Sequence, residues 1–155
     1  MNGIPEVVLV AATVGNGLLA GVFFAFSWGV VPGLRRVDDR SYVTVFRAIN
    51  RSIVNGLFIL VFLGAPIATV AATALHLDAA RREALAWLAA GLVFCLFSFA
   101  VTVLVNVPLN DRLGTAPIGG AQLQKARDRF EMRWNRWNHV RTATSTAALL
   151  VLAIA

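Results

Sequence analysis

The sequence predicts an all-α membrane protein, a single domain over residues 1–155 that folds as a four-helix transmembrane bundle. The chain is 58% hydrophobic and only 14% charged, whereas an ordinary soluble domain is about 25% charged. The apolar residues also gather in long stretches that are nearly free of charge. Only helices and closed barrels satisfy the backbone within lipid. These stretches are too long for barrel strands and do not alternate, so we expect helices.

The expected membrane spans follow from the length of each apolar stretch. A helix needs roughly 20 apolar residues to cross the hydrocarbon, and the first three stretches are long enough. The last charge-free stretch, 142–155, is too short unless its helix begins upstream, within the sequence RWNRWNHVRT at 133–142. The segment before the first stretch lacks Lys and Arg, which favours a retained span over a cleaved signal. The predicted spans are 5–31, 52–77, 84–109 and 134–155.

The cationic side chains predict the orientation of the chain in the membrane. Twelve of the fourteen Lys and Arg residues fall between the first and second apolar stretches, 32–51, or between the third and the fourth, 111–141. The positive-inside rule assigns these two connections to the cytoplasm, so both termini are expected on the non-cytoplasmic side of a multi-pass plasma-membrane protein. The net charge of +6 is then explained by topology and by attraction to acidic lipids, and no nucleic-acid partner is expected.

The connections between the spans carry signals of their own. Pro32 and Gly33 are expected to end the first helix, and Ser41 to cap an amphipathic lead-in to the second. The outer connection, Leu77–Glu83, reads as a tight turn. After TAPIGG, a basic helix that starts near Ala121 is expected to lie along the membrane surface before it enters the fourth span.

Two similar segments suggest an internal repeat. VVPGLRR ends the first span and NVPLNDR ends the third, and an Arg- and Asn-rich entry into the next span follows each. A duplicated helical hairpin around an axis along the membrane normal would give this pattern. Convergent chemistry at helix ends is the alternative, because Pro and Arg are common there.

Polar side chains fall on one face of each expected helix when residues are placed at about 100° intervals. The third span carries Cys95, Ser98, Thr102 and Asn106 on one face. The fourth carries Asn135, Asn138, His139, Thr142, Ser145 and Thr146. Because polar groups that face lipid are costly, these faces should meet inside the bundle, where hydrogen bonding between helices is one sufficient role.

The cytoplasmic end of the expected bundle holds more amides than helix packing requires, which favours a pocket there. His139 is the group in this cluster that titrates near neutral pH, although a structural role is commoner for a single histidine. The chain has one cysteine, Cys95, and no acid beside His139, so no disulfide and no metal site are predicted. The cluster contains Asn50, Asn55, Asn106, Asn110, Asn135, Asn138 and His139, with Arg47, Arg51 and Arg141 nearby.

Four blocks of the sequence together resemble the DUF1772 family, the anthrone-oxygenase-like integral membrane proteins. The blocks are GLLAGVFFAFSWGVVPGL, FRAINRSIVNGLF, NVPLNDRL and RWNRWNHVRT. The resemblance implies a small four-helix membrane protein, closest to the bacterial branch. Characterised fungal members oxidise polyketide anthrones to anthraquinones with molecular oxygen. The family's motif positions fall on Asn106, Pro108, Asn110, Trp137, Asn138, His139 and Arg141.

A cofactor-independent oxygenase is the function that this resemblance and these residues favour. A flat, apolar, anthrone-like molecule would enter from the bilayer, His139 would act as general base, and Trp134 would stack on the rings. Oxygen would be the co-substrate, since the sequence shows no flavin or metal motif. The oxyanion would be stabilised by Asn106, Asn110, Asn138 and Arg141 or Arg51, and the substrate would also be bound by Asn50, Asn55, Asn135 and Thr142.

Two other classes of function remain open from the sequence. A small-molecule carrier could use four helices as a dimer, and a homo-oligomer is compatible with the chain. None of the eight acidic residues falls within the apolar stretches 7–31, 52–77, 84–110 and 142–155, which counts against ion-coupled transport. A non-enzymatic membrane scaffold predicts that the polar cluster is packed solid, whereas a binding protein or an enzyme predicts a cavity.

Overall fold

The structure is a computed structural model that describes residues 3–77, 82–117 and 121–155, and helices are the only regular structure within these ranges. The all-α prediction is therefore confirmed. The elements are α1 (Ile4–Ala25), the π-helical turn η1 (Phe26–Val30), α2 (Val31–Leu34), α3 (Asp39–Ile53), α4 (Gly56–Leu75), α5 (Arg82–Val101), the π-helical turn η3 (Thr102–Asn106), α6 (Val107–Thr115) and α7 (Ala121–Ile154).

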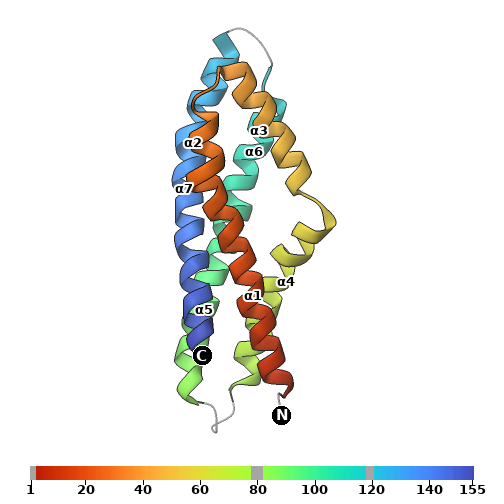
Figure 1. Ribbon diagram of the computed structural model, residues 1–155, viewed down its shortest axis with the longest axis vertical. Helices are drawn as coiled ribbons and strands as arrows, with labels where there is room; N and C mark the ends of the chain where they lie inside the picture. Colours follow the sequence, from red (N-terminus) through yellow and green to blue (C-terminus); the bar gives the residue numbers. More distant parts are fainter. Residues whose placement is uncertain (1–2, 78–81, 118–120) are drawn as a thin grey trace.

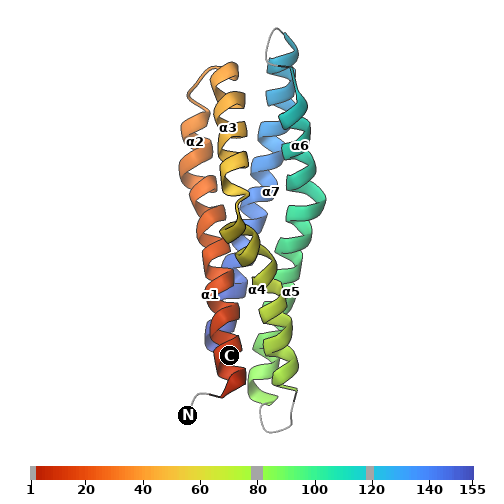
Figure 2. The ribbon, with the colours of Figure 1, turned by 90° about the vertical axis from the view of Figure 1, so that its right-hand side faces the viewer.

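The helices run along one common axis (Figures 1 and 2). The segments α1–η1–α2 and α5–η3–α6 each form a continuous rod, α7 forms a third, and α3 and α4 form a rod that is interrupted near its middle. Helix α1 packs against α4 and α7, and α5 packs against the same two helices. The two halves of the chain therefore contact each other through α1 with α7 and through α4 with α5.

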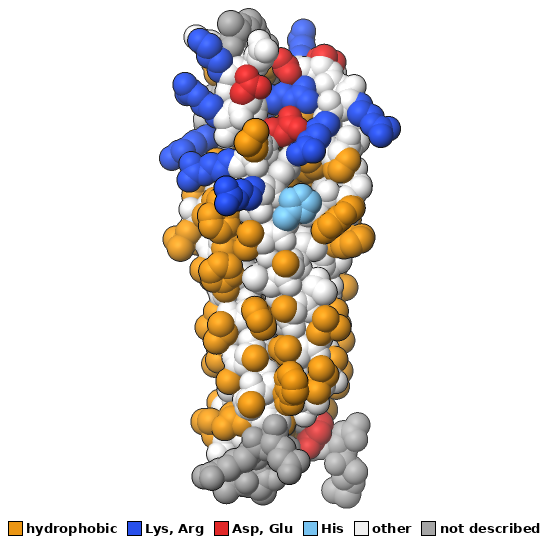
Figure 3. Space-filling view, turned by 90° about the vertical axis from the view of Figure 1, so that its left-hand side faces the viewer, with side chains coloured by type: hydrophobic (Ala, Val, Ile, Leu, Met, Phe, Trp, Pro, Cys, Tyr) orange, Lys and Arg blue, Asp and Glu red, His pale blue; other side chains and the backbone are white. Residues whose placement is uncertain are grey.

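Three helical segments are long and apolar enough to cross a membrane: Ile4–Leu34, Gly56–Leu75 and Ala84–Thr115. They indicate a multi-pass membrane protein. Large hydrophobic side chains cover the outside of these segments, and Leu60 and Leu104 are about 70% exposed. On the face drawn in Figure 3, hydrophobic side chains occupy most of the length while Lys and Arg gather at one end, here called the basic end. It contains the α2–α3 connection and the start of α7.

Small and polar side chains join the helices in the apolar half of the molecule. A Cβ on Gly15 would lie 3.0 Å from the Cβ of Ala65, so α1 and α4 approach closely there. The amide of Asn16 donates to the Thr69 hydroxyl at 3.1 Å. The hydroxyls of Ser98 and Ser145 lie 2.7 Å apart between α5 and α7. These contacts match the expectation that the polar faces meet between helices.

The prediction that Pro32 and Gly33 end the first helix is wrong, because the helix continues to Leu34. In η1 the Val31 N–H bonds the carbonyl of Phe26, five residues earlier. The second rod repeats this arrangement before Pro108, where the Val107 N–H bonds the Thr102 carbonyl. A wider turn before each proline accommodates a residue that lacks an N–H and would clash with an α-helical carbonyl. This likeness fits the duplicated hairpin, which stays a prediction.

The second predicted span and its amphipathic lead-in, which correspond to α4 and α3, begin differently from the prediction. Asp38, rather than Ser41, caps α3, because its Oδ1 accepts the backbone N–H groups of Arg40 and Ser41. The hydrogen bond from the Ser41 hydroxyl lowers the pKa of Asp38. The predicted span 52–77 does not start as one helix, since the chain breaks at Val54 and α4 begins at Gly56. Most of the Leu77–Glu83 turn and the end of TAPIGG lie outside the described residues.

An ion-pair network fixes the α2–α3 connection against α7. Arg127 binds Asp39 and Glu131, each at 2.9 Å, and Arg35 also reaches Glu131 at 2.9 Å. Burial opposes the charge of Arg127, but these bonds outweigh it and raise its pKa. The Arg127 guanidinium lies over the ring of Tyr42, whose pKa is raised by burial. Helix α7 consequently runs straight along the molecule (Figure 1). The prediction that its first part lies along the membrane surface, across the basic end, is therefore wrong.

Gly91→Ala is expected to destabilise the protein because α5 and α7 meet closely at this glycine. A Cβ there would lie 2.7 Å from Leu152 Cδ2 and 3.3 Å from Val151 Cγ2. Overpacking of this kind typically costs about 1–3 kcal/mol. Thermal unfolding in detergent measures the loss. Gly21→Ala is the control, since its Cβ would meet nothing within 4 Å. Equal melting temperatures for the two variants would contradict the close contact.

Candidate functional site

A small cavity lies at the level of the two π turns, just inside the basic end. Its volume is about 80 Å³. The exposed part of its lining is apolar, because Val54 is 55% and Val107 is 43% exposed, so the cavity opens toward the side of the molecule at the α3–α4 break. The cavity is lined by Val22, Phe23, Phe26, Phe46, Asn50, Ile53, Val54, Phe58, Thr102, Val107, Asn110, Trp134 and Arg141.

Arg141 forms the charged part of this wall although it is buried. Its Nη2 donates to Asn138 Oδ1 at 2.6 Å and its Nη1 to Thr102 Oγ1 at 3.4 Å, while its Nε has no hydrogen-bond partner in the part of the chain that the structure describes. The guanidinium lies 4.2 Å from the ring centre of Phe23 and 5.4 Å from that of Trp134. None of the ion pairs within the described ranges involves Arg141. The cavity wall therefore presents a cation that is paired only with neutral groups.

Asn138 holds Arg141 in place through a set of buried hydrogen bonds. Its amide nitrogen donates to the Phe23 carbonyl at 2.9 Å and to the Ser27 hydroxyl at 2.8 Å, so its oxygen faces Arg141. Ser27 and Thr142 also share a hydrogen bond of 3.0 Å. The side chain of Asn138 is 1% exposed. One asparagine thus orients the cation and ties α7 to α1 and η1.

The two π turns, which belong to different rods, both bring polar side chains to α7. Ser27 of η1 bonds Asn138 and Thr142. In η3, Thr102 accepts from Arg141, and the Asn106 amide donates to the Trp134 carbonyl at 3.4 Å. Turns of this type occur frequently at functional sites in other proteins. Here each turn rotates the side chains that follow it about the helix axis, and these polar groups point toward the part of α7 nearer the basic end.

A second polar chain lines the wall nearer the basic end. Trp134 Nε1 donates to Asn110 Oδ1 at 2.7 Å, and the Asn110 amide donates to Asn50 Oδ1 at 2.9 Å. The Trp134 ring packs against Phe26 and Phe46, with ring centres 5.7 Å and 5.0 Å away. Aromatic faces, two amides and one guanidinium therefore surround the same small space.

The structure brings together most of the residues that the sequence singled out, but not all of them. Asn50, Asn110, Trp134 and Arg141 line the cavity. Three further predicted residues, Asn106, Asn138 and Thr142, are buried directly behind it. Asn135 is buried too, but neither the oxygen nor the nitrogen of its amide has a hydrogen-bond partner among the described residues, and it does not line the cavity.

His139, Asn55 and Arg51 lie elsewhere. His139 was expected to point inward, yet its side chain is exposed and its ring packs edge-on against Trp28, with centres 5.2 Å apart. The face of α7 that points into the bundle is narrower than the sequence suggested, because Asn138 and Arg141 occupy it. Asn55 is exposed and caps α4 by accepting the Phe58 N–H, and Arg51 is exposed on α3.

Sequence reasoning missed the groups that depend on the π turns and on the α3 packing. Phe23, Phe26 and Phe46 were not assigned to the site, although they form most of its aromatic wall. Thr102 was placed on an inward stripe without a role in the site. The Val-Pro pairs that follow both π turns are the sequence signal that could have drawn attention to these positions.

Comparison of the sequence with known proteins identifies the family of the chain. A family model described as Anthrone oxygenase matches residues 56–151, more than half of the chain. No curated protein and no solved structure matches. The matched segment includes Asn110, Trp134, Asn138 and Arg141, whereas α1 and α3 precede it. The chain therefore belongs to the anthrone oxygenase family.

Proposed function

We propose that the chain is a membrane-embedded oxygenase whose flat, apolar, anthrone-like substrate binds as an anion beside Arg141. One observation carries this proposal: a buried arginine that has no acidic partner among the described residues lines a cavity with aromatic walls. The membership of the anthrone oxygenase family supports the same class of reaction. A solid scaffold would have no use for this cavity or for the unpaired Nε of Arg141.

The charge of Arg141 is the reason to expect an anion. Burying a cation away from water costs several kcal/mol unless a partner compensates, and Asn138 and Thr102 offer only neutral oxygens. An anionic ligand would supply the missing charge. The rings of Phe23 and Trp134, which flank the guanidinium, would pack against a flat ring system.

Stabilisation of the anion provides the chemistry. Loss of a proton from the anthrone methylene gives an enolate whose charge resides largely on the ketone oxygen, where Arg141 would stabilise it. The enolate passes one electron to oxygen, and the resulting radical and superoxide combine into a peroxide at the former methylene carbon. After protonation, loss of the remaining C–H proton with cleavage of the O–O bond leaves the quinone carbonyl and water. In this scheme the enolate itself supplies the electrons to oxygen, and no step takes an electron from a metal ion or a flavin.

The proton acceptor in this scheme is water. The histidine suggested by the sequence, His139, does not line the cavity and is exposed beside Trp28. Arg141 would make the bound anthrone more acidic, so a weak base suffices. Asn110 and Asn50 would bind the oxygen atoms at the opposite side of the rings.

Substrate entry requires the cavity to widen. Its volume of about 80 Å³ is well below the ~300–1,000 Å³ of ordinary ligand sites. The α3–α4 break at Val54 is the place where the wall can move, because the helix is interrupted there and the side chain is exposed. The apolar character of this edge favours entry from the bilayer.

The orientation in the membrane is part of the proposal. The apolar half of α7 packs along α1 and α5 and would form a fourth span over 134–155, completing a four-helix transmembrane bundle. The basic end would face the cytoplasm of a plasma membrane, with both termini on the other side. Lys and Arg gather at this one end (Figure 3), which supports this orientation.

Oxygen uptake with anthrone, corrected for autoxidation in buffer, tests the proposed reaction. The purified protein is expected to accelerate uptake and to form one anthraquinone per oxygen consumed. A rate no higher than that of buffer would contradict the proposed function.

His139→Ala is expected to retain at least half of the wild-type rate in the same assay, because its side chain lies outside the cavity. Removal of a general base typically lowers the rate about 10²–10⁴-fold. A loss of that size, with an unchanged melting temperature, would assign the base to His139 after all.

A further inference from the structure

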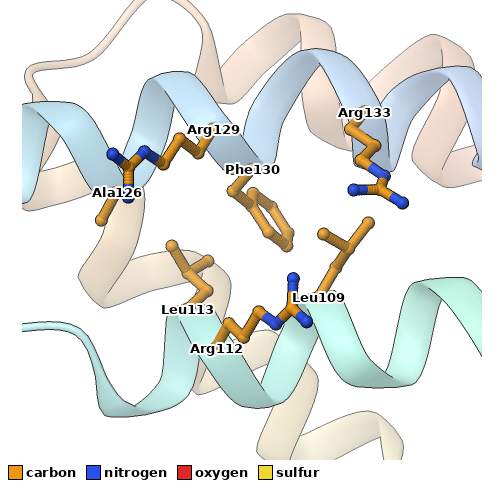
Figure 4. Close-up of a pocket in the computed structure, with 7 residues that line it drawn as sticks. All are labelled: Leu109, Arg112, Leu113, Ala126, Arg129, Phe130 and Arg133. Atoms are coloured by element: carbon orange, nitrogen blue, oxygen red, sulfur yellow. The ribbon is translucent and has the colours of Figure 1, made fainter.

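A second hollow lies between α6 and α7 at the basic end, and its lining is strongly cationic. Its volume is about 410 Å³, and it shares no lining residue with the Arg141 cavity. In Figure 4, Arg112 extends from α6 and Arg129 and Arg133 extend from α7, while Leu109, Leu113 and Phe130 point into the space between the helices. We propose that this hollow binds the phosphate head group of an acidic phospholipid.

The three arginines have no acidic partner within the described residues. The ion pairs there use Arg35 and Arg127, and the acids Asp39 and Glu131 are both occupied by them. Arg127 on the same helix is fully paired, so the lack of partners at Arg129 and Arg133 is a local property of this side of α7. Arg112 of α6 and Arg129 and Arg133 of α7 line the same hollow, and like charges around one space repel each other unless an anion lies between them. Arginine binds phosphate oxygens in a forked, two-point geometry that suits this arrangement.

The surroundings of the hollow favour a lipid over a soluble anion. The buried side chains of Leu109, Leu113 and Phe130 give it an apolar floor, which a free phosphate would not use. Basic pockets between membrane helices on the cytoplasmic side commonly hold acidic lipid head groups. The level also fits, because the hollow is at the basic end, directly beyond the apolar surface of the helices.

A neighbouring hollow offers a path for the acyl chain. It has a volume of about 630 Å³ and shares Arg129 and Arg133 with the first hollow. From there it follows α7 toward the apolar half through Met132, Trp137 and Val140, and Met132 is 78% exposed. Asp128 and Arg136 also line it. Because Asp128 would repel a phosphate, the head group belongs on the Arg112 side, with the chain running past Trp137.

Lipid titration of the delipidated protein in neutral detergent tests this proposal. Native mass spectrometry counts bound dioleoyl-phosphatidylglycerol, and thermal unfolding measures stabilisation. Dioleoyl-phosphatidylcholine and inorganic phosphate serve as the other ligands. The wild-type protein is expected to retain one phosphatidylglycerol and to melt at a higher temperature with it, while the other two ligands have no such effect.

Two triple variants with the same change in charge separate a site from general attraction. The site variant combines Arg112→Gln, Arg129→Gln and Arg133→Gln, and its affinity for phosphatidylglycerol is expected to fall at least tenfold. The control combines Arg36→Gln, Arg40→Gln and Lys125→Gln, which are exposed at the same end but line neither hollow. The control is expected to bind as the wild type does.

Several outcomes would overturn the proposal. Equal losses in the two triple variants would indicate diffuse electrostatic attraction without a site. Stabilisation by inorganic phosphate that equals that by phosphatidylglycerol would assign the hollow to a soluble anion. If the site variant does not fold, Arg112→Gln and Arg133→Gln alone are each expected to weaken binding severalfold, and unchanged affinity in both would reject the site.

Discussion

Arg141→Met is expected to leave the protein as stable as the wild type, or more stable, while anthrone oxidation slows about 100-fold or more. Methionine has a similar length and needs no partner. Replacement of buried ionic groups by well-packed apolar residues is often neutral or stabilising by about 1–4 kcal/mol, which offsets the about 1–3 kcal/mol lost where Asn138 Oδ1 is left without its donor. The cation–π contacts with Phe23 and Trp134 become ordinary apolar contacts. Thermal unfolding and oxygen uptake measure the two effects on one preparation.

Arg40→Met is the control for this variant, since Arg40 is exposed on α3 and lies outside the cavity. It should change neither the melting temperature nor the rate. A large drop in the melting temperature of Arg141→Met would mean that Arg141 is kept for its bonds to Asn138 and Thr102. A wild-type rate in Arg141→Met would show that the charge of Arg141 has no part in the reaction.

Asn138→Leu is expected to reduce the free energy of unfolding by about 2–3 kcal/mol and to abolish activity. The change removes the bonds to Phe23 and Ser27 and leaves Arg141 Nη2 without its closest partner. Buried groups that lose a partner bear the full desolvation penalty, so the effect exceeds that of one lost hydrogen bond. Thermal or denaturant unfolding in detergent measures the difference.

Asn135→Leu provides a matched control on the same helix. Asn135 is also buried, at 5% exposure, but within the described ranges neither its side-chain nitrogen nor its side-chain oxygen has a hydrogen-bond partner. The same substitution there should be neutral or stabilising. If both variants lost stability equally, the effect would come from the size of leucine, and the orienting role of Asn138 would fail.

The positions of the long helices were predictable because lipid leaves a strong signal in the sequence. Apolar length alone located the segments that became α1, α4 and α5. The stripe Cys95, Ser98, Thr102 and Asn106 is buried along its whole length, as helical periodicity requires when polar groups avoid lipid. The inward positions of Asn138 and Thr142 follow from the same rule.

The finer features of the site depend on tertiary contacts and helix irregularities that the helical periodicity of the sequence does not predict. A π turn inserts extra backbone into a helix, so η1 and η3 shift every residue beyond them from the face expected at 100° per residue. Asn55 was expected to bind the substrate, but because the helix breaks at Val54, Asn55 instead caps the start of α4. His139 lies at the edge of the polar arc, where packing against Trp28 decided its direction.

The acidity of bound anthrone measures the role of Arg141 most directly. Anaerobic titration of the substrate with the purified protein follows the absorbance of its anion while no oxidation takes place. A guanidinium within a few ångströms of the ketone oxygen should lower the apparent pKa of the bound anthrone by about 1–3 pH units in the wild type, and this shift should vanish in Arg141→Met. The same pKa for bound and free anthrone in the wild-type protein would contradict an anion site at Arg141.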